Sequence, residues 1–231
     1  ADGQGALAIT DLSNLFGAVK FYSAARRAGL KPIVGADLWL EPEGSEKAAS
    51  RLVVLAQDRQ GYLNLCELLS RSWLSNAQRG QAWVQWDWLA ERGAGLIALS
   101  GAEHGAVGQA LLGGDSARAE ALARRLATDF PGRFYIELQR AGLPSNEAHV
   151  GAAVKLAAAL RLPVVATQPV QFLTEEDFEA HEARVCVAEG EMLANPRRIK
   201  RFGREQYFKT QAQMEALFAD LPSALRNTVE I

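Results

Sequence analysis

The sequence predicts an α/β fold, of the kind in which a TIM-like β/α barrel is incomplete or distorted. Short apolar runs rich in β-branched residues alternate with segments of helical periodicity along most of the 231 residues. Several of these runs are apolar at consecutive positions, which is typical of strands covered on both faces. Strands that alternate with helices favour βα units and a parallel sheet.

Six short segments with helical segments between them are expected to be strands. They are Ala6–Thr10, Ile33–Leu40, Leu52–Ala56, Leu96–Ser100, Phe134–Leu138 and Val164–Thr167. Six strands are more than a small open fold needs and too few to close a barrel of eight. The strand count therefore favours a distorted barrel.

The segments between the strands are expected to be helices that end at glycine or proline. Leu15–Ala28 is followed by Gly29, and Asn146–Leu160 lies shortly before Pro163. The segment Asp115–Phe130 places Ala119, Leu122, Ala123 and Leu126 on one stripe before Pro131. Such a stripe marks the buried face of an amphipathic helix.

The character of the chain changes near residue 175. Beyond it, the helical segments Glu176–Ala188 and Gln211–Phe218 flank a basic loop, and we expect no strand. We therefore divide the chain into a barrel over residues 1–175 and a helical end over residues 176–231. Both termini look like cuts within a longer protein. The polar stretch Glu41–Ser50 is expected to be an exposed loop.

Composition excludes several classes of function. The formal net charge is −2 and the pI is about 6.0, so the chain lacks the overall positive charge that binds phosphate backbones. Two distant cysteines, Cys66 and Cys186, indicate neither a disulfide framework nor a zinc-thiolate site. No apolar run approaches the roughly 20 residues that span a bilayer, and no basic leader precedes the first strand. We expect a cytoplasmic protein with no membrane partner.

Polar residues that follow the strands are the candidates for chemistry, because active sites of parallel α/β barrels lie at the carboxyl ends of the strands. Carboxylates gathered there would suit divalent ions and phosphoester hydrolysis. A two-metal site usually needs several histidine and carboxylate ligands, and this set contains one histidine. The candidates are Asp11, Asp37, Ser100, Glu103, His104, Glu137, Gln139, Thr167 and Gln168.

Motifs spread over nearly the whole chain resemble the PHP (polymerase and histidinol phosphatase) domain of bacterial replicative DNA polymerase III alpha subunits. Ala6–Leu40 resembles a strand ending in T-D-H-G-N, a helix and K-P-I-x-G-x-E. Leu52–Leu65 is similar to L-x-L-L-A-x-x-x-x-G-Y-x-N-L, and Gly95–Gly101 to G-L-I-x-L-S-G. Further matches are Phe134–Gln139 (Y-x-E-L-Q), Pro163–Phe172 (P-V-V-A-T-N-D-x-H-Y) and Gln206–Leu217.

The resemblance implies that the metal site of the family is degenerate here. Only Asp11 and Asp37 keep oxygen ligands, and the first strand of the family, with its H-x-H motif, is expected upstream of Ala1. Arg51 places a permanent cation where an ion would sit. The positions at which the metal ligands of the family are replaced are Leu12, Arg51, Ala102, Ala141, Pro169 and Gln171.

The resemblance also implies a function. The parent protein would be a replicative polymerase whose Mg²⁺-dependent catalysis lies in a palm domain beyond Ile231, and this part would hold no cofactor and not polymerise DNA alone. It would pack on the polymerase core of the same chain, dock the proofreading exonuclease subunit and meet DNA only through the parent. The alternative is a residual metal-dependent phosphoesterase, pyrophosphatase or 3′–5′ exonuclease activity.

Three features have a structural interpretation beside a functional one. Asp11 follows a strand and precedes a helix, where an aspartate caps backbone N–H groups, and we favour that role. The tryptophans of AWVQWDWL mix faces, so we expect core packing with at least one exposed indole. The basic run would contact DNA or the polymerase core, yet such a run is usually a solvated loop. It contains Arg197, Arg198, Lys200, Arg201 and Arg204.

Overall fold

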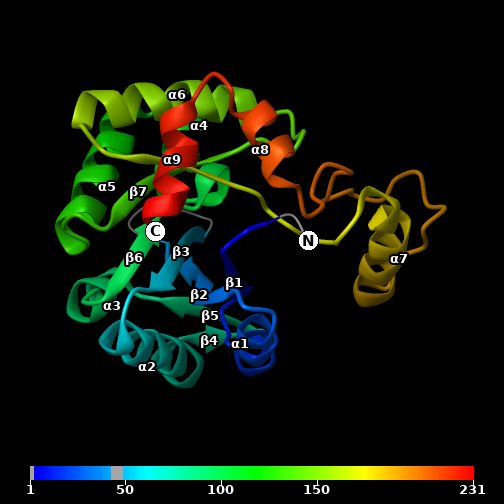
Figure 1. The fold of residues 1–231 in the computed structure, drawn as a ribbon, viewed down its shortest axis with the longest axis horizontal. Coiled ribbons are helices and arrows are strands. Elements are labelled where there is room, and N and C mark those ends of the chain that lie inside the picture. The colour runs from blue at the N-terminus through cyan, green and yellow to red at the C-terminus, as the bar shows by residue number, and fades with distance from the viewer. Residues whose placement is uncertain (1–2, 43–48) are drawn as a thin grey trace.

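The structure, a computed structural model, describes residues 3–42 and 49–231, and an eight-stranded mixed sheet lies at its centre (Figure 1). The strands follow the order β4-β5-β2-β3-β6-β7-β8, and β1 also pairs with β2. Residues 43–48 of the expected loop lie outside the described residues. The strands are β1 (Ala6–Leu12), β2 (Lys31–Leu40), β3 (Ser50–Ala56), β4 (Ala77–Gln78), β5 (Gln81–Val84), β6 (Leu96–Leu99), β7 (Phe134–Gln139) and β8 (Val164–Thr167).

All six predicted strands are present, whereas the hairpin of β4 and β5 was not predicted. Arg79 and Gly80 join its strands with φ angles of 52° and 78°. Two consecutive positive φ angles are typical of a type I′ hairpin turn, for which Asn-Gly and Asp-Gly are the usual signals. Arg-Gly gave too weak a signal, and the strands are only two and four residues long.

The expectation of a parallel sheet is correct only in part, because β3 is antiparallel to both of its neighbours. The β1/β2, β2/β5, β6/β7 and β7/β8 pairs are parallel, whereas β2/β3 and β3/β6 are antiparallel. The link from Leu40 to Ser50 is too short for the crossover of about a dozen residues that parallel neighbours require. The start of β3 therefore lies beside the ends of β2 and β6.

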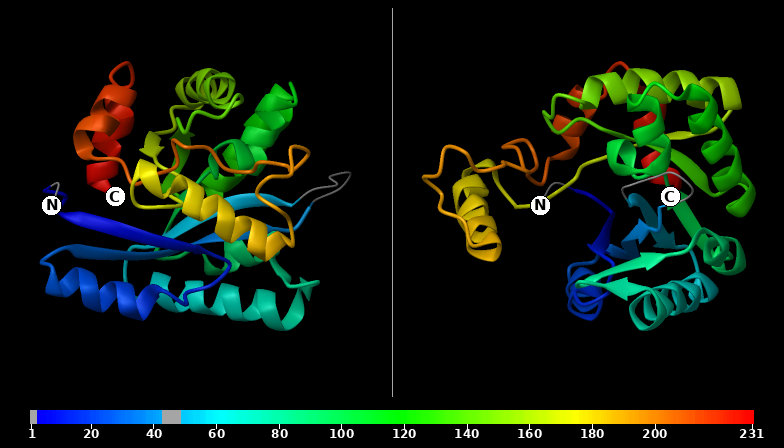
Figure 2. Two further views of the ribbon diagram at one scale, coloured as in Figure 1. Left: turned by 90° about the vertical axis from the view of Figure 1, so that its right-hand side faces the viewer. Right: turned by 180° about the vertical axis from the view of Figure 1, so that it is seen from behind.

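Helices pack around the outside of the curved sheet and enclose the main core, so they lie both below and above the strands in Figure 2. Asp58 caps α2 by accepting from the Gly61 N–H at 2.8 Å, and Asp115 caps α5 by accepting from the Arg118 N–H at 3.0 Å. The helices are α1 (Ala18–Arg27), α2 (Arg59–Ser75), α3 (Trp86–Arg92), α4 (Ala106–Leu112), α5 (Ser116–Asp129), α6 (Asn146–Leu160), α7 (Phe178–Glu189), α8 (Gln211–Leu217) and α9 (Pro222–Glu230), with short 3-10 turns at Ala102–His104 and Glu175–Asp177.

The tryptophan-rich run belongs to the core. Trp86 and Trp88 are buried, and Trp83 is half-buried. The guanidinium of Arg125 lies 4.8 Å from the Trp86 ring centre, and that of Arg71 lies 4.4 Å from the Trp88 ring centre. The expectation that one of these indoles is exposed is wrong, because α3 turns both of its rings inward and arginines cover them.

The barrel stays open between β1 and β8, which do not pair with each other. The C-terminal helix α9 packs along β8, and the Asn227 side-chain amide donates to the Val164 carbonyl at 2.7 Å. A small apolar cluster of Leu55, Ile97, Leu99 and Val165 lines the inner face of the sheet. The bond from Asn227 thus satisfies the Val164 carbonyl on the edge strand β8 of the open sheet.

Residues 176–231 occupy two places. Helix α7 projects from the body (Figure 1), whereas α8 and α9 return to it. Phe218 at the end of α8 is fully buried, and Arg140 next to β7 forms ion pairs with Asp220 at 2.6 Å and Glu147 at 2.9 Å. No helix in the described ranges is long and apolar enough to cross a membrane.

Candidate functional site

The pair of Asp37 and Arg51 occupies the inner face of the sheet. Arg51 Nε donates to Asp37 Oδ1 at 2.9 Å, and its terminal nitrogen contacts Oδ2. Trp39 is the cross-strand neighbour of Arg51, and its ring centre lies 5.2 Å from the guanidinium carbon. The two strands thus hold a fork of N–H donors against the carboxylate, the geometry in which such pairs are strongest.

Leu12 stands beside Asp37 in the register of β1 and β2. Asp11, the other retained carboxylate, takes a different direction. Its Oδ2 accepts from the Gly17 N–H at 3.0 Å in the loop that leads into α1, and a Cβ on residue 17 would lie 2.8 Å from this oxygen. Asp11 therefore fixes the entry to α1 and forms no hydrogen bond or ion pair with Asp37 or Arg51.

Glu137 on β7 is a second carboxylate on the inner face, and it is 2% exposed. Its oxygens accept from Gly101 N at 3.0 Å, Thr167 Oγ1 at 2.5 Å and Gln139 Nε2 at 3.1 Å. All three donors are neutral. Burial raises the pKa of Glu137, the Asp37 charge adds to the effect, and the hydrogen bonds oppose it.

The pKa of Asp37 is also raised above its ordinary value. Burial raises the pKa of its carboxyl group, while the bond to Arg51, the Arg51 charge and the charge of His104 lower it in part. The desolvation cost therefore outweighs the gain from a partner that is itself partly exposed to water. The two inner carboxylates share an environment that disfavours negative charge.

The turn after β6 carries Glu103 and His104 to the same rim. Glu103 is buried and accepts from the Ser145 hydroxyl and from Asn146 Nδ2 at 3.2 Å, while the exposed His104 ring lies 3.7 Å from its other oxygen. Gly101 has a φ of 78°, and a Cβ there would lie 2.4 Å from the Arg51 carbonyl oxygen. This close approach requires glycine and anchors the turn on β3.

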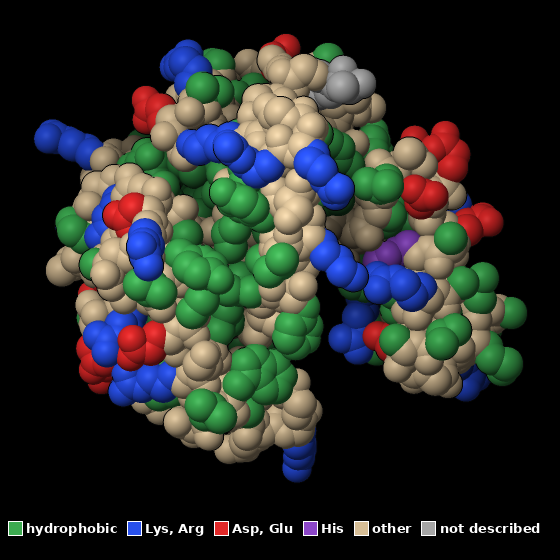
Figure 3. Space-filling view, turned by 60° about the horizontal axis from the view of Figure 1, so that its bottom comes forward, with side chains coloured by type: hydrophobic (Ala, Val, Ile, Leu, Met, Phe, Trp, Pro, Cys, Tyr) green, Lys and Arg blue, Asp and Glu red, His purple; other side chains and the backbone are tan. Residues whose placement is uncertain are grey.

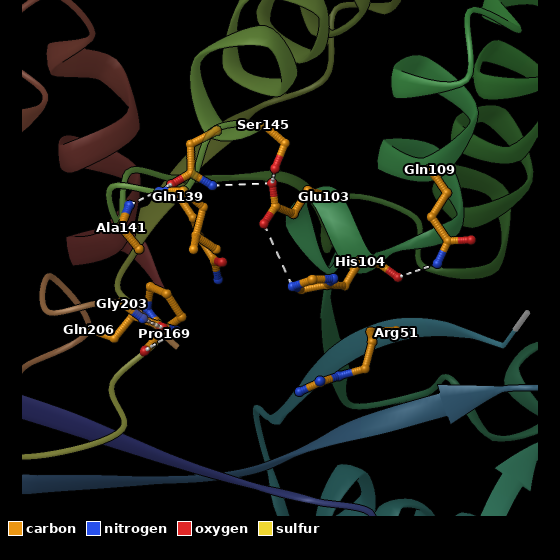
Figure 4. A network of polar contacts seen from close by, with 12 residues as sticks. Arg51, Glu103, His104, Gln109, Gln139, Ala141, Ser145, Pro169, Gly203 and Gln206 are labelled. Carbon is orange, nitrogen blue, oxygen red and sulfur yellow. Dashed lines mark hydrogen bonds and ion pairs between the residues drawn. The ribbon is translucent and has the colours of Figure 1, made fainter. Parts of the chain in front are cut away.

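Figure 4 shows Arg51, His104 and Gln139 turned toward one space that Ala141 and Pro169 border. Ala102 and Ala141 are 1% exposed and offer only methyl groups. Gln171 is exposed, and its backbone N–H donates to the Gln206 carbonyl at 2.8 Å. The structure thus brings Leu12, Asp37 and Arg51 together and places Ala102, Ala141 and Pro169 around the same rim, while Gln171 lies outside.

These residues do not fit a divalent metal. No group of three or more histidine, cysteine, aspartate or glutamate side chains within residues 3–42 and 49–231 is arranged to hold an ion. Asp37 already faces a guanidinium, and Glu137 already accepts from three donors. A cation entering here would have to displace Arg51 and would find one histidine, His104, which is far from the ligand sets that metals select.

Glu103 and Glu137 were predicted from the strand ends, whereas the two side chains that donate to Glu103 were not. Ser145 and Asn146 lie at the start of α6, and Asn146 Oδ1 also accepts from the Ala141 N–H at 2.7 Å. The P-S-N-E stretch reads as an ordinary helix start, so local pattern predicts a cap there. Only the packing of α6 against the turn after β6 turns the same residues toward Glu103.

The basic run is largely neutralised within the α7 region. Arg198 forms a buried ion pair with Glu182, Arg201 lies 2.9 Å from Glu189, and Arg204 lies 3.8 Å from Glu179. Arg197 and Lys200 are exposed, and neither forms an ion pair among the described residues. Two of the five cations thus remain for contact with a partner, and contact of the run with DNA stays a prediction.

Comparison with known proteins agrees with the motifs. The sequence model of the PHP domain matches residues 1–141. The chain is 49% identical to the DNA polymerase III subunit alpha of Pseudomonas aeruginosa over 229 residues, which are 99% of this chain and 20% of that protein. Identity is 44% to the subunits of Vibrio cholerae and Escherichia coli, with 100% and 99% of this chain covered. The chain spans about a fifth of the length of these curated relatives, 20% in each case.

Proposed function

This chain belongs to the PHP domain family, its relatives are DNA polymerase III alpha subunits, and we propose that it serves such a subunit as a scaffold without catalysis of its own. In this proposal it packs on the polymerase core of the same polypeptide and docks the proofreading exonuclease subunit. DNA and Mg²⁺ are engaged elsewhere in the subunit, which works in the cytoplasm.

The ion pair of Arg51 and Asp37 is the observation that carries the proposal. A hydrolytic PHP site would need its carboxylates free to hold ions that activate water. Here a guanidinium with fixed charge covers the one carboxylate that the metal-ligand positions retain on the inner face. The alternative, a residual phosphoesterase, pyrophosphatase or 3′–5′ exonuclease activity, requires this pair to open, and no contact of the described residues favours the open state.

The first test is the zinc and manganese content of the full-length alpha subunit, measured by elemental analysis after gel filtration. We expect less than 0.1 ion per chain as an order of magnitude for a site without ligands. One or more tightly held ions per chain, together with hydrolysis of a phosphodiester that survives inactivation of the polymerase site, would overturn the scaffold proposal.

The second test is the association of the full-length subunit with its purified proofreading exonuclease. We expect a stable complex in gel filtration at micromolar concentration. Deletion of residues 1–231 is expected to abolish it, whereas an alpha subunit inactivated at its polymerase site serves as the control and is expected to bind normally. An unchanged complex after the deletion would remove the docking role.

A further inference from the structure

The outer face of α1 combines exposed apolar side chains with unpaired positive charge. Phe16, Val19 and Tyr22 are 89%, 77% and 51% exposed. Their spacing of three residues places them along one side of the helix and the turn that leads into it. The rule that a soluble protein scatters its exposed apolar residues singly does not hold on this face.

The end of α2 extends this apolar face. Trp73 is 45% exposed, and its indole N–H donates to the Ser13 carbonyl at 2.7 Å, which fixes the ring beside the turn into α1. Figure 3, in which the underside with α1 and α2 comes forward, shows hydrophobic side chains grouped on that side. An indole held by a hydrogen bond presents its apolar surface at little cost in conformational entropy.

The charge of the same segment is entirely positive. Residues 12–36 contain Lys20, Arg26, Arg27 and Lys31 and no aspartate or glutamate. The whole chain has a net charge of −2, so a segment of +4 stands against −6 for the remaining residues. None of the four cations forms an ion pair with another of the described residues, so their charge is open to a partner.

A purely structural reading explains only part of this pattern. Arg26 and Arg27 lie in the last turn of α1, where positive charge interacts favourably with the helix dipole. Lys20 near the start of the helix and Lys31 after it gain nothing from that effect. Arg26 also falls four residues after Tyr22, on the apolar side, so cations and apolar groups share one face.

We propose that this α1 face docks an acidic protein segment whose apolar side chains cover its four ring or branched side chains. The α1 face is defined by Phe16, Val19, Tyr22, Trp73, Lys20 and Arg26. The inference rests on the proposed function, and it names the surface through which a partner subunit is held. Charge complementarity would steer the segment, and burial of the apolar side chains would supply the affinity.

A nucleic acid would be attracted by the same cations, but the apolar part of the face argues for a protein. Binding of single strands uses a basic groove with aromatic rings on which bases stack. The α1 face is the outside of a helix, and its central side chain, Val19, has no π surface. An aliphatic group exposed by 77% between the cations suits a protein partner.

The test uses the full-length subunit and its purified proofreading exonuclease as the probe, with affinity measured by surface plasmon resonance. Val19→Glu is expected to weaken binding at least tenfold, and Lys20→Gln with Arg26→Gln is expected to reduce the dependence of affinity on salt. Val187→Glu on α7 is the matched control, because Val187 is also an exposed helical valine, at 84%. The control is expected to bind like the wild type.

Three outcomes would overturn the inference, and they differ. If the wild type binds and Val19→Glu binds equally well, the surface is wrong while the scaffold proposal stands. If the wild type fails to bind, the docking role fails and this surface with it. If Val19→Glu leaves exonuclease binding intact but weakens binding of a fluorescent oligo-dT, the face serves nucleic acid. Unchanged thermal unfolding of each variant confirms that the change is local.

Discussion

Asp37 and Arg51 lie two residues apart in cross-strand register, and their side chains meet on the inner face of β2 and β3. This meeting depends on the reversal of β3, which brings the first residues of that strand to the rim where its neighbours end. In a strictly parallel sheet, position 51 would lie at the opposite edge. The reversed strand is therefore what turns a substitution at its start into a change of the site.

Replacement of Arg51 by alanine is expected to lower the free energy of unfolding by about 2 kcal/mol, because a partly buried Asp37 loses the one cation with which it pairs among the described residues. Urea unfolding of the full-length subunit, followed by a signal specific to this domain, measures the change. Asp37→Asn in the same background should restore much of the loss. Equal stability of wild type and Arg51→Ala would show that water compensates Asp37 fully.

The stability of the domain should fall as pH rises through the range set by Glu137. Burial raises the folded-state pKa of this group above its ordinary value of 4.5, so the folded state binds more protons than the unfolded state above that pH. Glu137→Gln removes the titration and keeps an acceptor. The free energy of unfolding of the variant minus that of the wild type should therefore be larger at pH 8 than at pH 5. A constant difference in urea midpoint at both values would contradict this expectation.

Arg198 and Arg197 are neighbours with opposite roles. Arg198→Ala leaves Glu182 buried without its cation and is expected to loosen the α7 region, raising the rate of trypsin cleavage within residues 190–209 several-fold. Arg197→Ala removes an exposed side chain without an ion pair and is expected to leave cleavage elsewhere in the loop unchanged. Equal behaviour of the two variants would mean that the Glu182 pair does not hold this region together.

Two phenylalanines test whether the C-terminal helices belong to the core. Phe218→Ala empties a fully buried site and should cost about 3–5 kcal/mol, the usual range for such a truncation. Phe16→Ala removes a ring that is 89% exposed and should stay within about 0.5 kcal/mol of the wild type. A small effect at Phe218 would indicate that α8 and α9 detach easily from the sheet.

The parts of the fold that depend on local pattern were predictable from sequence. Apolar runs marked β1, β2, β3, β6, β7 and β8, and the stripe of Leu122 and Leu126 marked α5. The direction of β3 was also implicit in the short link after Leu40, but the alternation of strands with helices suggested a parallel sheet and took precedence. The hairpin at Arg79–Gly80 was missed because Arg-Gly is a weak turn signal and its first strand, β4, has only two residues.

The site was predictable as a set of positions and less so as a set of contacts. Strand ends named Asp37, Glu103 and Glu137, and family motifs drew attention to Arg51. The pairing of Arg198 with Glu182 and of Ser145 with Glu103 joins residues 16 and 42 positions apart. No sequence period links residues at such separations, and tertiary packing alone decides whether a basic side chain faces solvent or a buried carboxylate.

The positive charge that faces Asp37 is covalently part of the polypeptide. A bound ion would leave when a chelator competes for it or when the protein is diluted. A guanidinium on the adjacent strand cannot dissociate under either condition. Its local concentration is fixed by the register of β2 and β3 and is the same in every folded molecule. The domain therefore acquires its internal cation at the moment of folding, independently of the supply of divalent ions in its surroundings.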